Sequence, residues 1–301
     1  MKIATFQQTN GTGGYRVGAI TAESEFVDLT SLVSNRDLNA NEVLECFDLD
    51  HGFYEKAKEA IARGGPRAAL DVNAITLSAP VPRPGKIICI GLNYRDHAAE
   101  SGMEISTSPI IFSKFSSCAV GPNASIVIPN GSTQCDYEAE LAFIIGRRAA
   151  NVSRENAIDH VFGYTNFNDV SARDFQFADG QWQRGKSCNT FAPMGAFVAT
   201  TDDVPDPQDL SIKLRLNGSA MQDSNTCQMI FGVAELVEFL SRYITLEPGD
   251  VVATGTPPGV GFARKPPVYL KDGDVIDVEI ERLGVLSNPV RQFAAASARP
   301  N

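Results

Sequence analysis

Apolar and polar residues alternate along short segments of the chain, as expected for β-strands with one buried face. In Ser211–Leu216 every second residue is apolar, and the dipeptide that follows, Asn217-Gly218, is typical of a hairpin turn. Val275–Ile280 alternates in the same way. The pattern therefore predicts a mainly β region in the second half of the chain.

Short apolar runs predict further strands. These runs are Lys86–Ile90, Ser125–Ile128, Leu141–Ile145, Val161–Phe167 and Val251–Thr254. One segment differs, because in Val233–Tyr243 the apolar residues recur at helical spacing. Strands therefore outnumber helices after about residue 81, and long irregular connections between them are where functional residues usually lie.

The first part of the chain has its own pattern. Three β-type runs are followed by two helical stretches, at Lys2–Phe6, Tyr15–Thr21, Glu25–Leu29, Asn41–Phe47 and Tyr54–Arg63. The stiff segment Ala79–Gly85, with a proline at every second position from Pro80, is typical of a boundary. We therefore predict an α+β, mainly β protein with a small N-terminal α/β module at 1–80, a larger domain at 81–293 and a flexible tail at 294–301.

Composition narrows the classes of function. The 301 residues carry a formal net charge of −10, which opposes binding to nucleic acid and to anionic membranes. The six cysteines stand singly, without a zinc-ligand spacing or a disulfide framework. The chain shows neither a signal-peptide core nor an apolar run long enough to cross a membrane. We therefore expect an intracellular, cytoplasmic protein, with the mitochondrial matrix as the alternative for a eukaryotic source.

Candidate chemistry begins with three acidic residues. Glu138 and Glu140 are two positions apart at the start of an apolar strand, so their side chains share a face, and Asp169 ends another apolar run. Carboxylates placed so close either take up a proton or hold a cation, and oxygen ligands alone favour Mg²⁺ or Mn²⁺, with Ca²⁺ as a further possibility. The alternative is a solvated strand edge that carries two glutamates.

A second candidate is the pair of His97 and Glu100. Residues three apart are neighbours on a helical turn, and a carboxylate beside an imidazole orients the ring and raises its basicity. Such a pair suits a general base that acts on water or on a C–H bond. The alternative is an ordinary surface pair.

Two more segments carry groups that can bind an anion. Arg173 and Gln176 share a helical face, and Lys186 follows downstream. The segment Gly180–Ser187 also satisfies a phosphate-loop pattern, but neither a buried strand before it nor a helix after it is expected, so nucleotide binding is rejected. Thr256 lies in a rigid Gly/Pro loop that either presents a hydroxyl group to a ligand or is simply a tight turn.

Taken together, four motifs in this order resemble the fumarylacetoacetate hydrolase superfamily. They read DYEAELAFIIG, HVFGYTNFNDVSARD, GKS and TGTPPGVG, and the resemblance spans about Lys86 to Val290. The chain is most similar to the branch with a short N-terminal module, which includes the domain-containing protein 2 type and oxaloacetate-decarboxylase-like members. This resemblance implies mixed β-sheets rolled around a central site, and a homodimer.

The resemblance also implies roles for individual residues. It implies Mg²⁺ or Mn²⁺ held by Glu138, Glu140 and Asp169, with His97 as general base. Glu100 is then the partner of His97, Lys186 joins these two as a catalytic residue, and the positions expected to contact substrate are Arg173, Gln176, Lys186 and Thr256. The fumarylacetoacetate hydrolases proper have a further Asp ligand where this chain carries Asn93, so fumarylacetoacetate is not expected as the substrate.

Such a site acts on a small 2-oxo acid through a metal-chelated enolate. The leading prediction is hydrolysis of the C–C bond of an acylpyruvate or another 2,4-dioxo acid, the commonest chemistry of the superfamily. The alternatives are decarboxylation of oxaloacetate and its keto–enol tautomerisation. A rival of another class is a noncatalytic metal-binding protein.

Overall fold

The computed structural model describes residues 1–9, 13–20, 26–63, 74–101 and 105–294. Within these ranges strands predominate and helices are short, which confirms the predicted α+β, mainly β class. The tail predicted at 294–301 lies, apart from Ala294, outside the described residues. None of the helices in the described ranges is both long enough and apolar enough to cross a membrane.

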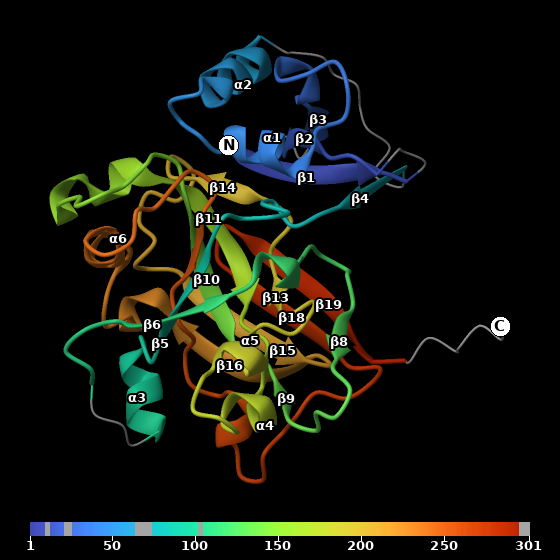
Figure 1. The fold of residues 1–301 in the computed structure, drawn as a ribbon, viewed down its shortest axis with the longest axis vertical. Coiled ribbons are helices and arrows are strands. Elements are labelled where there is room, and N and C mark those ends of the chain that lie inside the picture. Colours follow the sequence, from blue (N-terminus) through green and yellow to red (C-terminus); the bar gives the residue numbers. More distant parts are fainter. Residues whose placement is uncertain (10–12, 21–25, 64–73, 102–104, 295–301) are drawn as a thin grey trace.

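A large mixed sheet runs through the molecule (Figure 1). Its path runs β3-β2-β1-β14-β11-β10-β17-β5-β6, and β4 pairs with β1 beside this path. Its strands are β1 (Lys2–Gln8), β2 (Arg16–Ile20), β3 (Phe26–Asp28), β4 (Ile75–Leu77), β5 (Ile87–Gly91), β6 (Ile110–Lys114), β10 (Ala139–Ile145), β11 (Val161–Asn168), β14 (Val198–Thr200) and β17 (Val251–Ala253).

A second sheet packs against the middle of the first. Its order is β16-β15-β18-β19-β8, and β15, β18 and β19 contact β10 and β11. Its strands are β8 (Ile126–Ile128), β15 (Ser211–Leu216), β16 (Ser219–Asn225), β18 (Val275–Ile280) and β19 (Gly284–Gln292). Two short pairs complete the β structure, namely β7 (Ala119–Val120) with β13 (Ala192–Pro193), and β9 (Cys135–Asp136) with β12 (Ser171–Ala172).

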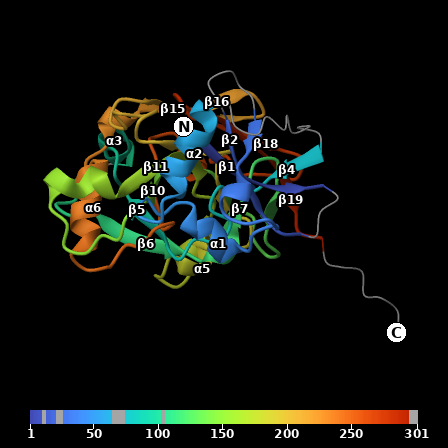
Figure 2. The ribbon, with the colours of Figure 1, turned by 90° about the horizontal axis from the view of Figure 1, so that it is seen from above.

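The helices lie around these sheets. They are α1 (Ala40–Glu45), α2 (Phe53–Ala62), α3 (Arg95–Ser101), α4 (Arg173–Gln176), α5 (Gln183–Lys186) and α6 (Val233–Ser241). The 3-10 helices are η1 (Thr30–Leu32), η3 (Ser116–Cys118), η4 (Arg154–His160), η5 (Thr226–Gln228) and η6 (Gly261–Ala263). Figures 1 and 2 show α1 and α2 together at the N-terminal end, whereas α4 and α5 lie toward the opposite end in Figure 1.

The N-terminal segment joins the large sheet directly, because β1 pairs with β14. The division into modules at residue 80 stays a prediction. The strands and helices predicted within the first 63 residues are confirmed to within two residues at each end.

Burial follows the predicted patterns where they are regular. Every residue of β10 and β11 is buried, and β15 alternates between partly and fully buried positions. Several strands lack a regular apolar pattern and were not predicted, among them β6, β16 and β19. In β19 the buried face includes Asn288, whose amide donates to two backbone carbonyls, so a polar residue occupies a core position.

At Gly163, β11 packs so closely against β14 that we expect no larger residue to fit. A Cβ atom on this residue would lie 2.1 Å from the carbonyl oxygen of Ala199 in β14, so backbone would have to move. Gly163→Ala should lower the free energy of unfolding by roughly 2–3 kcal/mol in a denaturant titration. Ser219→Ala, on an exposed residue of β16, is the control. Equal stabilities of the two variants would contradict the packing argument.

Candidate active site

Three acidic side chains meet because β10 and β11 are antiparallel. Ala139 at the start of β10 pairs with Asn168 at the end of β11, so the residues just beyond them, Glu138 and Asp169, are also adjacent. The Asp169 backbone N–H donates to the Glu138 carbonyl over 2.9 Å, and Glu140 lies two residues along β10. Strand pairing therefore brings together acids that are about 30 positions apart in sequence.

The three carboxylates form a compact group. One oxygen from each of Glu138, Glu140 and Asp169 lies within 4.8 Å of the others, and all three side chains are buried. This set offers oxygen ligands only, which fits a hard divalent cation such as Mg²⁺ or Mn²⁺. The solvated strand edge considered above is thereby excluded.

Two buried lysines lie against the same carboxylates. Lys186 Nζ donates to Glu138 Oε2 over 2.8 Å and to Asp169 Oδ2 over 2.7 Å. Lys114, at the end of β6, donates to the other oxygen of Asp169 and to the Val170 carbonyl. Both oxygens of Asp169 are therefore held in fixed directions.

Arg173 connects the carboxylate group to α4. Its guanidinium donates to Glu138 over 2.6 Å, to Asp136 over 2.9 Å and to Gln176 over 3.0 Å. Asp136 also accepts the backbone N–H groups of Gly261 and Phe262. Arg173 and Gln176 therefore share the helical face that the sequence predicts.

Negative charge exceeds positive charge in this buried cluster. Four carboxylates (Asp136, Glu138, Glu140 and Asp169) face three cations (Lys114, Arg173 and Lys186), all at most 7% exposed. Burial opposes ionisation of Glu138, but Lys186 and Arg173 outweigh it and lower its pKa to about 2. Burial, Asp169 and Glu138 all raise the pKa of Glu140 well above its usual range. The uncompensated charge is thus concentrated at Glu140, which a bound cation would neutralise.

A cavity of about 260 Å³ opens beside this cluster. Of the residues predicted to act in the site, those that line it are His97, Glu138, Glu140, Arg173, Gln176, Lys186 and Thr256. Asp169 and Glu100 are not among the lining residues, but Asp169 accepts a hydrogen bond from Lys186 and Glu100 contacts His97. Aromatic and aliphatic side chains form the rest of the wall, including Ile90, Phe112, Phe177, Trp182 and Phe262.

His97 enters the cavity from α3. It is 5% exposed, and its Nδ1 lies 3.2 Å from Glu100 Oε2. The Glu100 carboxylate also accepts the Gly259 backbone N–H over 3.2 Å. Because Nδ1 faces Glu100, Nε2 is the ring nitrogen left for a ligand. The alternative of an ordinary surface pair does not fit, because the His97 side chain is buried.

The loop after β17 completes the site. Gly255 N–H donates to Glu140 over 2.8 Å, and the neighbouring Thr256 hydroxyl accepts from Gln222 over 2.8 Å. Asn93 is fully buried, and its amide bonds to the backbone of Phe231 and Thr254. Among the described residues, the hydrogen bonds of the Asn93 side chain all go to the backbone.

Sequence reasoning missed Lys114, Phe112 and the role of Asp136. A lysine that ends an apolar run, as in Ile110–Lys114, is a signal for a buried charge with a partner. No local pattern identifies that partner, because it lies 55 residues away. The rejected phosphate-loop pattern has a different structure, since α5 ends at Lys186 where a phosphate loop would begin a helix.

Comparison with known proteins gives consistent matches. The family model for the fumarylacetoacetate (FAA) hydrolase C-terminal region matches residues 86–291. The oxaloacetate tautomerase fahd2, mitochondrial, of Xenopus laevis is 43% identical over 96% of this chain and 90% of its own length. The oxaloacetate tautomerase FAHD2A, mitochondrial, of Bos taurus is 45% identical over 84% of this chain and 83% of its own.

Solved structures show the same fold. The maleylpyruvate hydrolase from Sphingobium sp. SYK-6, in complex with manganese(II) ion and pyruvate, superimposes with a TM-score of 0.79. It is 31% identical, and the alignment covers 98% of this chain and all of that one. That protein therefore combines this fold with a divalent metal ion and a 2-oxo acid.

The charge excess at Glu140 generates a prediction for the protein in EDTA. Glutamine keeps the shape of the side chain and can still accept from Gly255, so Glu140→Gln should raise the unfolding temperature. The raised pKa keeps Glu140 protonated in the folded protein, whereas the unfolded chain loses this proton above the usual carboxyl pKa. Unfolding of the native chain is therefore favoured more and more as the pH rises above that value, whereas glutamine has no proton to lose. The advantage of the variant should therefore grow from acidic to neutral pH.

Calorimetric scans at several pH values check this, and each kcal/mol gained corresponds to a rise of roughly 2–4 °C. Glu279→Gln, which removes a surface pair with Arg215, is the control and should change little. A Glu140→Gln variant that is less stable than the native chain at every pH would contradict the charge argument.

Proposed function

Because the chain belongs to the fumarylacetoacetate hydrolase family, we propose that it is a divalent-metal-dependent enzyme that interconverts the keto and enol forms of oxaloacetate. The observation that carries this proposal is the similarity to two oxaloacetate tautomerases over most of the chain. Oxaloacetate tautomerisation was an alternative in the sequence analysis, and it now has more support than the leading prediction, acylpyruvate hydrolysis. The cavity supports the proposal because it joins a carboxylate cluster to a buried histidine.

The metal would be held by Glu138, Glu140 and Asp169. Their buried oxygen atoms and the excess negative charge fit Mg²⁺ or Mn²⁺. Such an ion would polarise the 2-oxo group and neighbouring carboxylate of the substrate, which makes the adjacent C–H bond more acidic.

The remaining polar groups of the cavity would bind and orient the substrate. Arg173, Lys186 and Gln176 present donors to a dicarboxylate, and Arg173 is held rigidly by Asp136 and Glu138. The Thr256 hydroxyl accepts from Gln222, so its own hydrogen is free to point toward a ligand. Lys186, as an ammonium group beside the carboxylates, would stabilise the negative charge that develops on the substrate oxygen.

Proton transfer would fall to His97. Its Nε2 removes a proton from C3 of the keto form, while Glu100 at Nδ1 stabilises the imidazolium that results. The imidazolium then gives this proton to the 2-oxo oxygen and returns to its neutral form, so the enol has the same composition as the keto form and no bond between carbon atoms is broken. The reverse sequence returns the proton to C3.

Two other reactions need an additional event at the same site. Decarboxylation requires loss of the C4 carboxylate as CO₂, and acylpyruvate hydrolysis requires water to attack a 4-keto group. The maleylpyruvate hydrolase that shares the fold is the reason to keep hydrolysis as the second candidate. A metal-binding protein without catalysis is the remaining alternative, and turnover of no 2-oxo acid would favour it.

We also propose that the protein forms the homodimer implied by the resemblance, which light scattering at micromolar concentration would test. A monomeric mass would contradict this proposal. The relatives from Xenopus laevis and Bos taurus are named as mitochondrial. For this chain, the cytoplasm and the mitochondrial matrix both remain predictions.

Removal of the proposed base should abolish tautomerisation. In the presence of Mg²⁺, His97→Gln should reduce the rate of enol loss, followed by ultraviolet absorbance, by roughly 10²–10⁴-fold. His51→Gln is a matched control, because His51 also lies near a glutamate, Glu45, but is half exposed. Formation of pyruvate and cleavage of acetylpyruvate are measured in parallel. Full activity of His97→Gln would remove His97 from the mechanism, and pyruvate as the main product would replace tautomerisation by decarboxylation.

Activity should depend on the metal and on its proposed ligands. EDTA should abolish turnover, and Mg²⁺ or Mn²⁺ should restore it. Glu138→Gln should weaken Mn²⁺ binding more than about tenfold in calorimetry or electron paramagnetic resonance, because even changes beside metal ligands often cost that much. Glu279→Gln is again the surface control. Unchanged Mn²⁺ affinity in Glu138→Gln would contradict the assignment of this ligand.

A further inference from the structure

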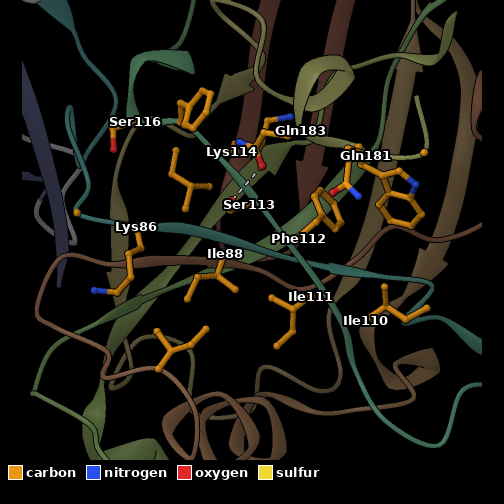
Figure 3. Close-up of a pocket in the computed structure, with 16 residues that line it drawn as sticks. Lys86, Ile88, Ile110, Ile111, Phe112, Ser113, Lys114, Ser116, Gln181 and Gln183 are labelled. Atoms are coloured by element: carbon orange, nitrogen blue, oxygen red, sulfur yellow. Dashed lines mark hydrogen bonds between the residues drawn. The ribbon is translucent and has the colours of Figure 1, made fainter. Parts of the chain in front are cut away.

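A surface groove of about 740 Å³, shown in Figure 3, shares part of its lining with the proposed active-site cavity. Its lining comes mainly from β5, β6 and the segment before α5, and it combines apolar side chains, among them five isoleucines, with six polar or charged ones. Two residues, Phe112 and Trp182, line both the groove and the 260 Å³ cavity. These two rings therefore form a partition between the cavity and the groove, which we call the aromatic wall.

The two rings of the aromatic wall contact each other. Their centroids are 5.2 Å apart and their planes are inclined at 70°, an edge-to-face arrangement that is favourable between aromatic side chains. Lys186 Nζ lies 4.9 Å from the centroid of the Phe112 ring, so this ring also borders the charged cluster. One face of the wall is thus directed to the site where the substrate would bind.

A glycine allows the tryptophan to sit at this position. A Cβ atom on Gly91 would lie 3.1 Å from Cζ3 of Trp182, so the indole packs directly on the backbone at the end of β5. Trp182 immediately precedes α5, whose Lys186 N–H donates to the Trp182 carbonyl over 3.0 Å. The indole and the Lys186 ammonium are therefore carried by the same short helical turn.

Hydrogen bonds hold the two halves of the wall together. Ser113, next to Phe112, donates to Gln183 over 3.1 Å, as the dashed line in Figure 3 shows. Gln183 in turn donates to Ser187 over 2.8 Å, and Ser187 accepts the Phe115 backbone N–H over 3.2 Å. The chain just after Phe112 is thus joined to the chain just after Trp182 by side-chain hydrogen bonds, which hold β6 and α5 together beside the ring pair.

We propose that the aromatic wall determines substrate length: Phe112 and Trp182 close the cavity beyond the carboxylate cluster and restrict the site to short 2-oxo acids. This inference rests on the proposed function and adds its substrate class. A four-carbon dicarboxylate would fit between the carboxylate cluster and the wall, whereas a long apolar chain on the keto carbon would meet the two rings. Without one of the rings, the cavity would continue into the groove, whose apolar side chains offer contacts to such a chain.

The experiment measures binding of a homologous series to the Mn²⁺-loaded full chain. The probes are pyruvate, 2-oxohexanoate, 2-oxooctanoate and 2-oxodecanoate, and calorimetry gives a dissociation constant for each. In the native chain the affinity should stop increasing, or should fall, once the chain length reaches the wall. In Trp182→Ala it should continue to increase, by roughly fourfold for each methylene group that enters the groove.

Phe112→Ala opens the same partition from β6, so it provides a second test if Trp182→Ala does not fold. The matched control is Phe115→Ala, because Phe115 lines the groove but not the cavity and is 60% exposed. This variant should keep the chain-length dependence of the native protein. Trp182 is the single tryptophan of the chain, so its fluorescence in the native protein and in Phe115→Ala reports ligand contact at the wall itself.

The outcomes separate this inference from the proposed function. A native preference for short acids that is lost in Trp182→Ala or Phe112→Ala supports the wall, even if oxaloacetate is not turned over and tautomerisation has to be abandoned. Conversely, turnover of oxaloacetate with the same chain-length dependence in all variants would overturn the wall while leaving tautomerisation intact. Native affinity that rises steadily to 2-oxodecanoate would also overturn it.

Discussion

The arrangement of this protein depends on keeping a cluster of unbalanced charges out of water. Four carboxylates and three cations are buried together, and each cation is held by at least two oxygen atoms. A charge without a partner at these positions would cost several kcal/mol, so the groups constrain one another strongly. Cations lie against Glu138 and Asp169, whereas no ion pair to Glu140 is found among the described residues. The site is therefore prepared for one more positive charge.

The two sheets supply the rigidity that this cluster needs. β10 and β11 are buried along their full length, and β15, β18 and β19 cover them. Asn166 in β11 donates to the carbonyls of Val278 and Gly284, which joins the two sheets by polar bonds as well as by apolar packing. Acids at the ends of such strands have little freedom to move apart. Their mutual repulsion is therefore not reduced by movement of the side chains, and a bound cation would reduce it instead.

The family relationship and the geometry answer different questions about function. The matched relatives are named as oxaloacetate tautomerases, whereas the cavity shows that a histidine, a carboxylate cluster and cationic donors lie together in one place. Hydrolysis, decarboxylation and tautomerisation all begin from a 2-oxo acid, so groups that bind the 2-oxo carboxylate do not separate them. The ring pair of Phe112 and Trp182 lies beyond those groups, at the border between the cavity and the groove.

The sequence by itself determined those features that short-range periodicity encodes. Alternation placed Glu138 and Glu140 on one face, helical spacing paired His97 with Glu100 and Arg173 with Gln176, and apolar runs located the central strands. The motif resemblance added the family. Only the tertiary structure decided which distant groups meet, since Lys114 and Asp169 are 55 residues apart and Gln222 and Thr256 are 34 apart. Such contacts arise from strand order and sheet packing, and these depend on the whole chain because no local pattern specifies which strands become neighbours.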